Sequence, residues 1–178
     1  MDKKRGNKGQ VWIETVIYTL IAFSLIAAVL AFVKPKIDEM QDKAIIEQSI
    51  SLMKEIDSTI REIIQGGAGN KRILEISIKE GTLNINGETN EILFEMETDY
   101  VYSEIGKEIN EGNLIIKTEE KGPSNMITIK RNYEYNITFN LKEKLEALTK
   151  AGTSYQISIT NNGIPEDSEI ININFELV

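Results

Sequence analysis

The chain has 178 residues and a mass of 20.1 kDa, enough for one domain or for one domain with an appendage. It contains neither cysteine nor histidine, so disulfides, thiol nucleophiles, zinc fingers and imidazole-based acid–base catalysis are excluded. The net charge of -8 argues against a nucleic-acid partner, because proteins bind nucleic acids largely by neutralising phosphates.

The N-terminal part of the chain predicts a membrane-spanning helix. Residues 1–9 form a basic segment with a net charge of +3, and residues 15–33 are 19 consecutive residues without a charged side chain. As a helix this run extends about 28 Å, close to the roughly 30 Å hydrocarbon thickness of a bilayer. It is too long for the apolar core of an ordinary signal peptide. Because basic flanks stay on the cytoplasmic side, we expect residues 1–9 in the cytoplasm and the acidic body outside.

One acidic residue, Glu14, lies in the same predicted helix just before the uncharged run. A carboxylate deep in a bilayer costs roughly 2.5–3.5 kcal/mol on insertion scales and normally has a partner, so Glu14 is a candidate functional residue. The alternative is that Glu14 lies at headgroup depth and contacts water there. The neighbouring Trp12 needs no functional explanation, because tryptophan is common at membrane interfaces.

The segment Lys8-Gly9-Gln10-Val11-Trp12-Ile13-Glu14 resembles the processing site of type IV pilin precursors, in particular the class III signal peptides of archaeal pilins. The resemblance covers roughly residues 3–35. It implies that a prepilin peptidase cleaves the bond between Gly9 and Gln10, so that Gln10 becomes the first residue of the mature protein and Glu14 the fifth. It also implies that Glu14 pairs with the new α-amino group of a neighbouring subunit during assembly. Two charges that are costly alone in lipid then stabilise each other.

An amphipathic helix is expected to follow over residues 34–65. Pro35 predicts a kink or a break; it either allows local unwinding when subunits leave the bilayer or only marks the membrane surface. Gly66 and Gly67 are expected to end the helix and to begin a glycine-rich linker over residues 66–71. We expect one apolar stripe to pack on the chain's own globular domain, a parallel coiled-coil stalk being the alternative. The stripe has steps of three and four apart from one step of two, and comprises Ile37, Met40, Ala44, Ile46, Ile50, Met53, Ile56, Ile60 and Ile63.

The rest of the chain, residues 72–178, predicts a β-rich domain in which apolar and polar residues alternate between turns. Asn86-Gly87 predicts a two-residue hairpin turn. Residues 141–151 are expected to form a short connecting helix, because Leu141, Leu145 and Leu148 recur at helical spacing. The predicted fold class is therefore α+β, a long N-terminal helix followed by a C-terminal antiparallel β-sandwich-like domain. The expected strands cover residues 76–78, 83–85, 92–96, 114–118, 126–131, 133–140, 154–160 and 170–177.

No catalytic, cofactor-binding or metal-binding residues are predicted. The 28 acidic residues show no spacing typical of acid–base pairs. The acidic segment 165–169 lacks the ligand order of a calcium loop and is expected to be a surface turn. Gly66-Gly67-Ala68-Gly69 lacks the lysine of a phosphate-binding loop. Asn136-Ile137-Thr138 is the one Asn-X-Ser/Thr sequon of the sequence, so Asn136 is a candidate N-glycosylation site on an exported domain.

Together these features predict a structural subunit of an archaeal type IV pilus-like surface filament, acting in assembly and adhesion. The expected partners are other copies of the chain, the prepilin peptidase and, before assembly, membrane lipid; no cofactor and no nucleic acid are expected. We expect the precursor in the cell membrane, with the C-terminal domain outside, and the assembled protein in a cell-surface filament. The alternative is a non-polymerising single-span anchor with an extracellular β-sandwich binding domain, of the archaellum stator or envelope-binding kind. A membrane-tethered enzyme is not expected.

Overall fold

The computed structural model describes residues 8–166 and 168–178. The described residues form a helix, α1 (Lys8–Gln65), followed by ten strands, which is an α+β layout as the sequence predicts. It divides into two compact units, Met1–Gln41 and Asp42–Val178. The C-terminal part of α1 therefore belongs to the same unit as the strands, whereas the sequence places the start of the globular domain after the linker.

The first unit consists, in its described part, of α1 up to Gln41. Every side chain from Trp12 to Gln41 is exposed, so the rest of the described chain does not cover the apolar run. The helix continues through Pro35, and the break that the sequence allows is absent. Proline at this position leaves the carbonyl of Ala31 without its usual helical donor. Because the helix is exposed here, that carbonyl stays open to other donors, and the helix does not have to end.

The second unit contains two β-sheets. A six-stranded antiparallel sheet has the order β4-β5-β6-β3-β2-β8, and a four-stranded sheet has the order β1-β9-β10-β7. The β7–β10 pair is parallel, so the expectation of a purely antiparallel domain is wrong for this pair. The strands are β1 (Lys71–Ile76), β2 (Thr82–Asn86), β3 (Glu91–Thr98), β4 (Glu108–Glu111), β5 (Leu114–Lys121), β6 (Ser124–Asn132), β7 (Asn136–Phe139), β8 (Leu145–Thr149), β9 (Tyr155–Asn161) and β10 (Asn172–Leu177).

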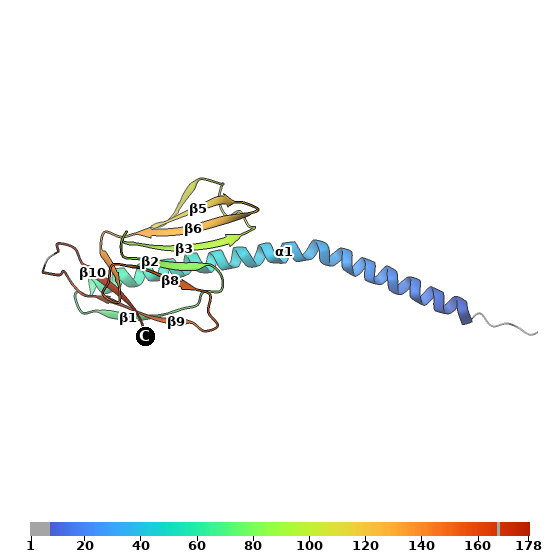
Figure 1. The fold of residues 1–178 in the computed structure, drawn as a ribbon, viewed down its shortest axis with the longest axis horizontal. Coiled ribbons are helices and arrows are strands. Elements are labelled where there is room, and N and C mark those ends of the chain that lie inside the picture. Colours follow the sequence, from blue (N-terminus) through green and yellow to red (C-terminus); the bar gives the residue numbers. More distant parts are fainter. Residues whose placement is uncertain (1–7, 167) are drawn as a thin grey trace, which may run out of the picture. The chain divides into compact units, whose positions relative to one another are not determined.

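The C-terminal part of α1 lies in the core of this unit. In Figure 1 strands β3, β5 and β6 lie on one side of it, and β1 and β9 on the other. Six apolar side chains of the predicted stripe are buried and share one core cluster with residues of both sheets, which confirms that this part of the stripe packs on the chain's own domain. Burial of such side chains stabilises the fold by roughly 25 cal/mol per Å² of apolar surface removed from water. They are Ile46, Ile50, Met53, Ile56, Ile60 and Ile63.

The first three residues of the predicted stripe do not join the core. Ile37, Met40 and Ala44 are exposed, so the prediction of one continuous buried stripe is wrong for them. Ile37 and Met40 lie in the first unit, where every side chain from Trp12 to Gln41 is exposed. For Ala44 the reason is the step of two residues to Ile46, which turns the side chain by about 200° around the helix. Ala44 therefore points away from the strands that bury Ile46.

The helix α1 ends where the sequence predicts, at Gly66 and Gly67. Gly66 and Gly67 donate backbone hydrogen bonds to the carbonyls of Glu62 and Ile64, and Gly67 has a positive φ of 83°. The carbonyl of Ile63 accepts from the buried side-chain amide of Asn161 on β9, at 3.2 Å. Carbonyls in the last turn of a helix lack intrahelical donors, so this contact also ties the helix end to the four-stranded sheet.

Two local predictions are corrected by the structure. Residues 141–151 do not form a helix: β8 covers Leu145–Thr149 and pairs with β2, and only Leu148 of the three leucines is buried. Asn140 and Leu141 have φ angles of 52° and 61°, in the left-handed region, so the chain turns here and no right-handed helix begins. The hairpin at Asn86-Gly87 exists, but Asn86 pairs with Glu91, so its loop has four residues, not two.

Candidate functional site

The residues of the predicted processing site lie at the start of α1. Gly9 and Gln10 are in the first turn, five and four residues before Glu14, so the backbones of Gln10 and Glu14 are about one helical turn apart. Glu14 is exposed, and among the described residues it has no hydrogen bond or ion pair. The basic segment 1–9, the predicted leader, falls mostly outside the described residues, since the structure describes none of residues 1–7. No partner for Glu14 is therefore present within the described part of one chain.

The apolar part of α1 is long and apolar enough to serve as a membrane anchor or as a signal segment. Within Trp12–Gln65 it contains an apolar window none of which is buried, and it is the one such helix among the described residues. A core helix of a globular protein of this length would have a buried face. This helix has none before Asp42, and its apolar surface therefore needs a cover that the described chain does not supply.

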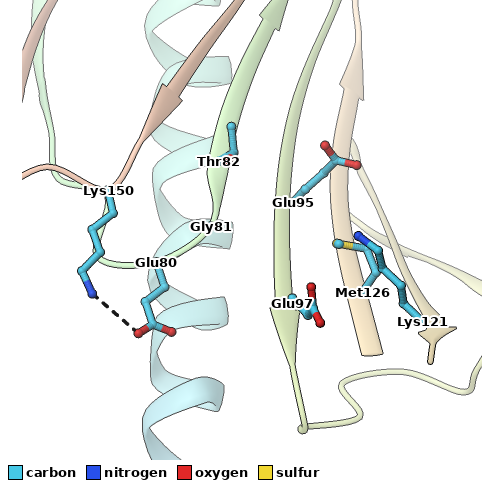
Figure 2. A pocket seen from close by; sticks show the side chains of 8 residues that line it. All are labelled: Glu80, Gly81, Thr82, Glu95, Glu97, Lys121, Met126 and Lys150. Carbon is cyan, nitrogen blue, oxygen red and sulfur yellow. Dashed lines mark ion pairs between the residues drawn. The ribbon is translucent and has the colours of Figure 1, made fainter. Parts of the chain in front are cut away.

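The domain has a cavity of about 570 Å³ beside the ends of β2 and β3, lined by charged side chains (Figure 2). Glu80 and Lys150 form an ion pair across 3.8 Å on one side of it. Glu95 and Glu97, from β3, lie on the other side together with Lys121. Glu95 accepts a hydrogen bond from Asn84 at 3.0 Å and Glu97 accepts one from Ser124 at 2.5 Å. Neither carboxylate has a basic partner among the described residues.

Gly81 shapes this cavity. Its φ is 83°, and a Cβ placed on it would lie 2.5 Å from the backbone oxygen of Glu95 and 2.7 Å from the ring of Phe94. Only glycine allows the chain before β2 to approach β3 this closely. Nothing in a single sequence indicates which distant backbone Gly81 approaches.

A buried carboxylate, Asp57 on α1, is the centre of a polar cluster that the sequence did not predict. Its side chain is 5% exposed. Oδ1 accepts from Nε of Arg131 on β6 at 2.8 Å, and Oδ2 accepts from Asn113 at 3.2 Å. Arg61 forms an ion pair with Oδ2, also at 3.2 Å. Two guanidinium groups compensate the buried charge, and the cluster connects the helix to the six-stranded sheet. The feature of the sequence that could have indicated a buried charge is an acidic residue between Ile56 and Ile60, which both belong to the predicted apolar stripe.

Tyr133 lies next to this cluster. The Arg131 guanidinium is 5.0 Å from the centre of its ring, and its hydroxyl is buried without a hydrogen-bond partner among the described residues. Burial raises the pKa of Tyr133 above its ordinary value, and the nearby Asp57 charge raises the pKa further. Both effects disfavour the phenolate form. The unpaired hydroxyl is a cost to the fold.

Replacing Tyr133 by phenylalanine is expected to stabilise the domain by about 1 kcal/mol, because a buried unpaired hydroxyl is removed. The raised pKa holds Tyr133 protonated, so its contribution to stability is intact below pH 10 and is lost as the pH rises further. The wild type should therefore lose stability above pH 10 more steeply than Tyr133→Phe. Urea unfolding between pH 7 and pH 11, followed by circular dichroism, measures both effects.

Tyr155→Phe is the matched control, because the Tyr155 hydroxyl donates to the backbone oxygen of Thr149 at 2.8 Å. Loss of that bond should leave stability unchanged or lower it slightly. A Tyr133→Phe variant that is less stable than the wild type would show that the hydroxyl has a partner in solution.

The predicted sequon lies in an ordered strand. Asn136 begins β7 and its side-chain amide donates to Glu143 at 2.9 Å. The hydroxyl of Thr138 is buried and donates to the side chains of Asn172 and Asn174 on β10. β10 pairs with β7, so the hydroxyl of the sequon is enclosed once the last strand of the sheet is in place.

No group of three or more acidic side chains is arranged to hold a metal ion within residues 8–166 and 168–178. In the acidic segment 165–169, Ser168 donates its backbone N–H to the carbonyl of Pro165, and its hydroxyl accepts from the N–H of Ile170. Asp167 of this segment lies outside the described residues.

Comparison with known proteins finds no family model that matches the chain, and no curated protein or solved structure that is similar to it.

Proposed function

We propose that this protein is a structural subunit of an archaeal type IV pilus-like filament on the cell surface. The observation that carries the proposal is an uncovered apolar helix that begins with the segment from Lys8 to Glu14 and is followed by a compact β domain. In the membrane, lipid covers the apolar side chains. In a filament, the helices of other copies cover them, and packing between helices replaces packing with lipid.

The exposed Glu14 has a defined role in this proposal. Cleavage between Gly9 and Gln10 creates an α-amino group that is largely cationic near neutral pH. In the filament this amine, on one copy, pairs with the carboxylate of Glu14 on a neighbouring copy. The pair makes the two charges tolerable in a water-poor core and fixes how far along the axis neighbouring helices are displaced. The protein thus acts by assembly and adhesion and carries out no catalysis.

The expected mature protein begins at Gln10. Expression in an archaeal host with its processing peptidase, followed by intact-mass measurement of sheared surface fibres and of the membrane fraction, tests this directly. Fibre-derived protein should lack residues 1–9, and the variant Gly9→Val should keep the leader and stay in the membrane. Protein in the membrane fraction that keeps residues 1–9, with no fibres on the cell, would instead support a single-span anchor that does not polymerise.

A further inference from the structure

We propose that Asn136 is a glycosylation site that is open only until β10 takes its place in the four-stranded sheet. The folded domain is closed to the oligosaccharyltransferase, the enzyme that attaches N-linked glycans, so a glycan on Asn136 is attached before β10 docks. This site goes beyond filament assembly. It depends on export of the domain and on its fold, whether or not the chain polymerises.

The sequon Asn136-Ile137-Thr138 makes up most of β7. N-glycosylation attaches the sugar to the asparagine and requires a serine or threonine two positions later, so the transferase has to reach the Thr138 hydroxyl as well as the Asn136 amide. In the folded domain these two groups differ in exposure. The Asn136 side chain is half-buried and donates to the exposed Glu143 at 2.9 Å, whereas Thr138 is 5% exposed.

The contacts that enclose Thr138 come from β10. Its hydroxyl donates to the side-chain oxygens of Asn172 at 3.3 Å and Asn174 at 3.0 Å. β10 is also the one strand that pairs with β7 in the described sheets. Rotation of the Thr138 side chain alone does not open the sequon, because Ile137 and Phe139 on either side of it are buried in the core. β7 therefore has to separate from β10 before the transferase can bind the sequon.

The order in which the two strands emerge leaves the sequon open for a time. Asn136 pairs with Asn172, more than 30 positions later, so in a chain that emerges from its N-terminal end β7 is accessible before β10 has emerged. The pairing is also non-local, and closing a long loop costs more conformational entropy than forming a hairpin such as that of β5 with β6. Until β10 docks, β7 lacks its strand partner and both polar groups of the sequon are accessible.

The transfer needs a lipid-linked oligosaccharide phosphate as its second substrate. Nδ2 of Asn136 forms a bond to the first carbon of the sugar, the bond between that carbon and the carrier phosphate breaks, and the phosphate leaves with the bonding electron pair. Nδ2 loses one of its two protons and keeps the other. The remaining proton is available for the hydrogen bond to Glu143, which lies at the surface, so β7 can enter the sheet with the glycan in place.

Transfer to the full-length protein in detergent, purified from a host that attaches no N-glycans, tests the proposal. Archaeal membranes supply the transferase and its lipid-linked oligosaccharide, and fragmentation mass spectrometry locates the glycan. Phe175→Asp places an unpaired carboxylate at a fully buried position of β10 and keeps this strand out of the sheet. Leu177→Asp, at a 47% exposed position of the same strand, is the matched control. Glycosylation of Asn136 should be about tenfold or more faster in Phe175→Asp than in the wild type or the control, because the folded domain has to open before each transfer.

Lys142→Thr provides an internal control, because it completes a second sequon at Asn140 in the turn after β7. Asn140, Leu141 and Lys142 are all exposed. The folded variant should therefore be modified at Asn140 and not at Asn136, four residues away in the same molecule.

Three results would overturn the inference. Equal rates at Asn136 in the wild type and in Phe175→Asp would mean that β10 does not close the site. No transfer to Asn136 in Phe175→Asp would mean that this asparagine is not an acceptor in any state. No transfer to Asn140 in folded Lys142→Thr would mean that folding blocks the turn for a reason other than the contacts of Thr138 with β10. None of these results bears on cleavage after Gly9 or on fibre formation, so the proposed function is tested separately.

Discussion

Replacing Asp57 by alanine is expected to lower the free energy of unfolding by about 3 kcal/mol. The Asp57 side chain is 5% exposed, accepts hydrogen bonds from Arg131 and Asn113, and forms an ion pair with Arg61. Its removal leaves the guanidinium of Arg131, which is 27% exposed, without a counter-charge. An unpaired charge at such a site is expensive, whereas the intact pair is close to neutral in energy.

Urea unfolding of the full-length protein in detergent measures this change. The tyrosines of the β domain report on it by near-ultraviolet circular dichroism, since Trp12, the one tryptophan, lies in the apolar helix. Lys54→Ala is the control: the Lys54–Glu111 pair is 2.6 Å long but half-exposed, and its loss should cost less than about 1 kcal/mol. Asp57→Ala and Arg131→Ala should be strongly non-additive when combined. If Asp57→Ala lowered the free energy of unfolding by less than about 1 kcal/mol, the role of Asp57 as the buried counter-charge of Arg131 would be contradicted.

Replacing Glu14 by alanine is expected to reduce the amount of subunit in surface fibres by about tenfold or more. In the proposed filament the variant leaves the α-amino group of a neighbouring copy unpaired in a water-poor core. The amount of precursor inserted into the membrane should not decrease, because the variant removes a charge from an apolar helix. The measurement compares, by quantitative immunoblot, the subunit in sheared fibres with the subunit in the membrane fraction.

Glu39→Ala is the matched control for Glu14→Ala. Glu39 lies on the same helix beyond the uncharged run and forms an exposed ion pair with Lys36 at 2.6 Å. Its replacement should leave fibre yield unchanged. If Glu14→Ala cells made fibres at the level of Glu39→Ala cells, the carboxylate would have no part in assembly, and a position at headgroup depth would explain it.

The apolar helix and the strand periods were predictable because each depends on local sequence. An uncharged run of 19 residues specifies a helix that needs lipid or other helices, and glycines at 66 and 67 specify where α1 stops. The alternation of apolar and polar residues in β3, β5 and β6 follows directly from one face of each strand being buried. These features could be predicted without knowing which distant segments of the chain they contact.

Errors occurred where a distant strand overrides the local pattern. Leu141, Leu145 and Leu148 have helical spacing, yet pairing with β2 makes their segment a strand and buries only Leu148. The acidic strand β4 has almost no apolar residues and was not predicted, since its pairing with β5 alone holds it in the sheet. The parallel pair of β7 with β10 joins residues more than 30 positions apart, which no periodicity reveals.

The sequence by itself determined the order of segments along the chain: a basic N-terminal segment, an apolar helix bearing Glu14, an amphipathic continuation and a β-rich body without cysteine or histidine. These properties follow from composition and from spacing over a few residues. Only the tertiary structure decided that Asp57 pairs with Arg131 and that Gly81 lies against the backbone of Glu95 beside a cavity. Each of these depends on which strands pair and on how the helix packs between the sheets. Such long-range contacts are fixed by the burial of the whole core and not by any single segment.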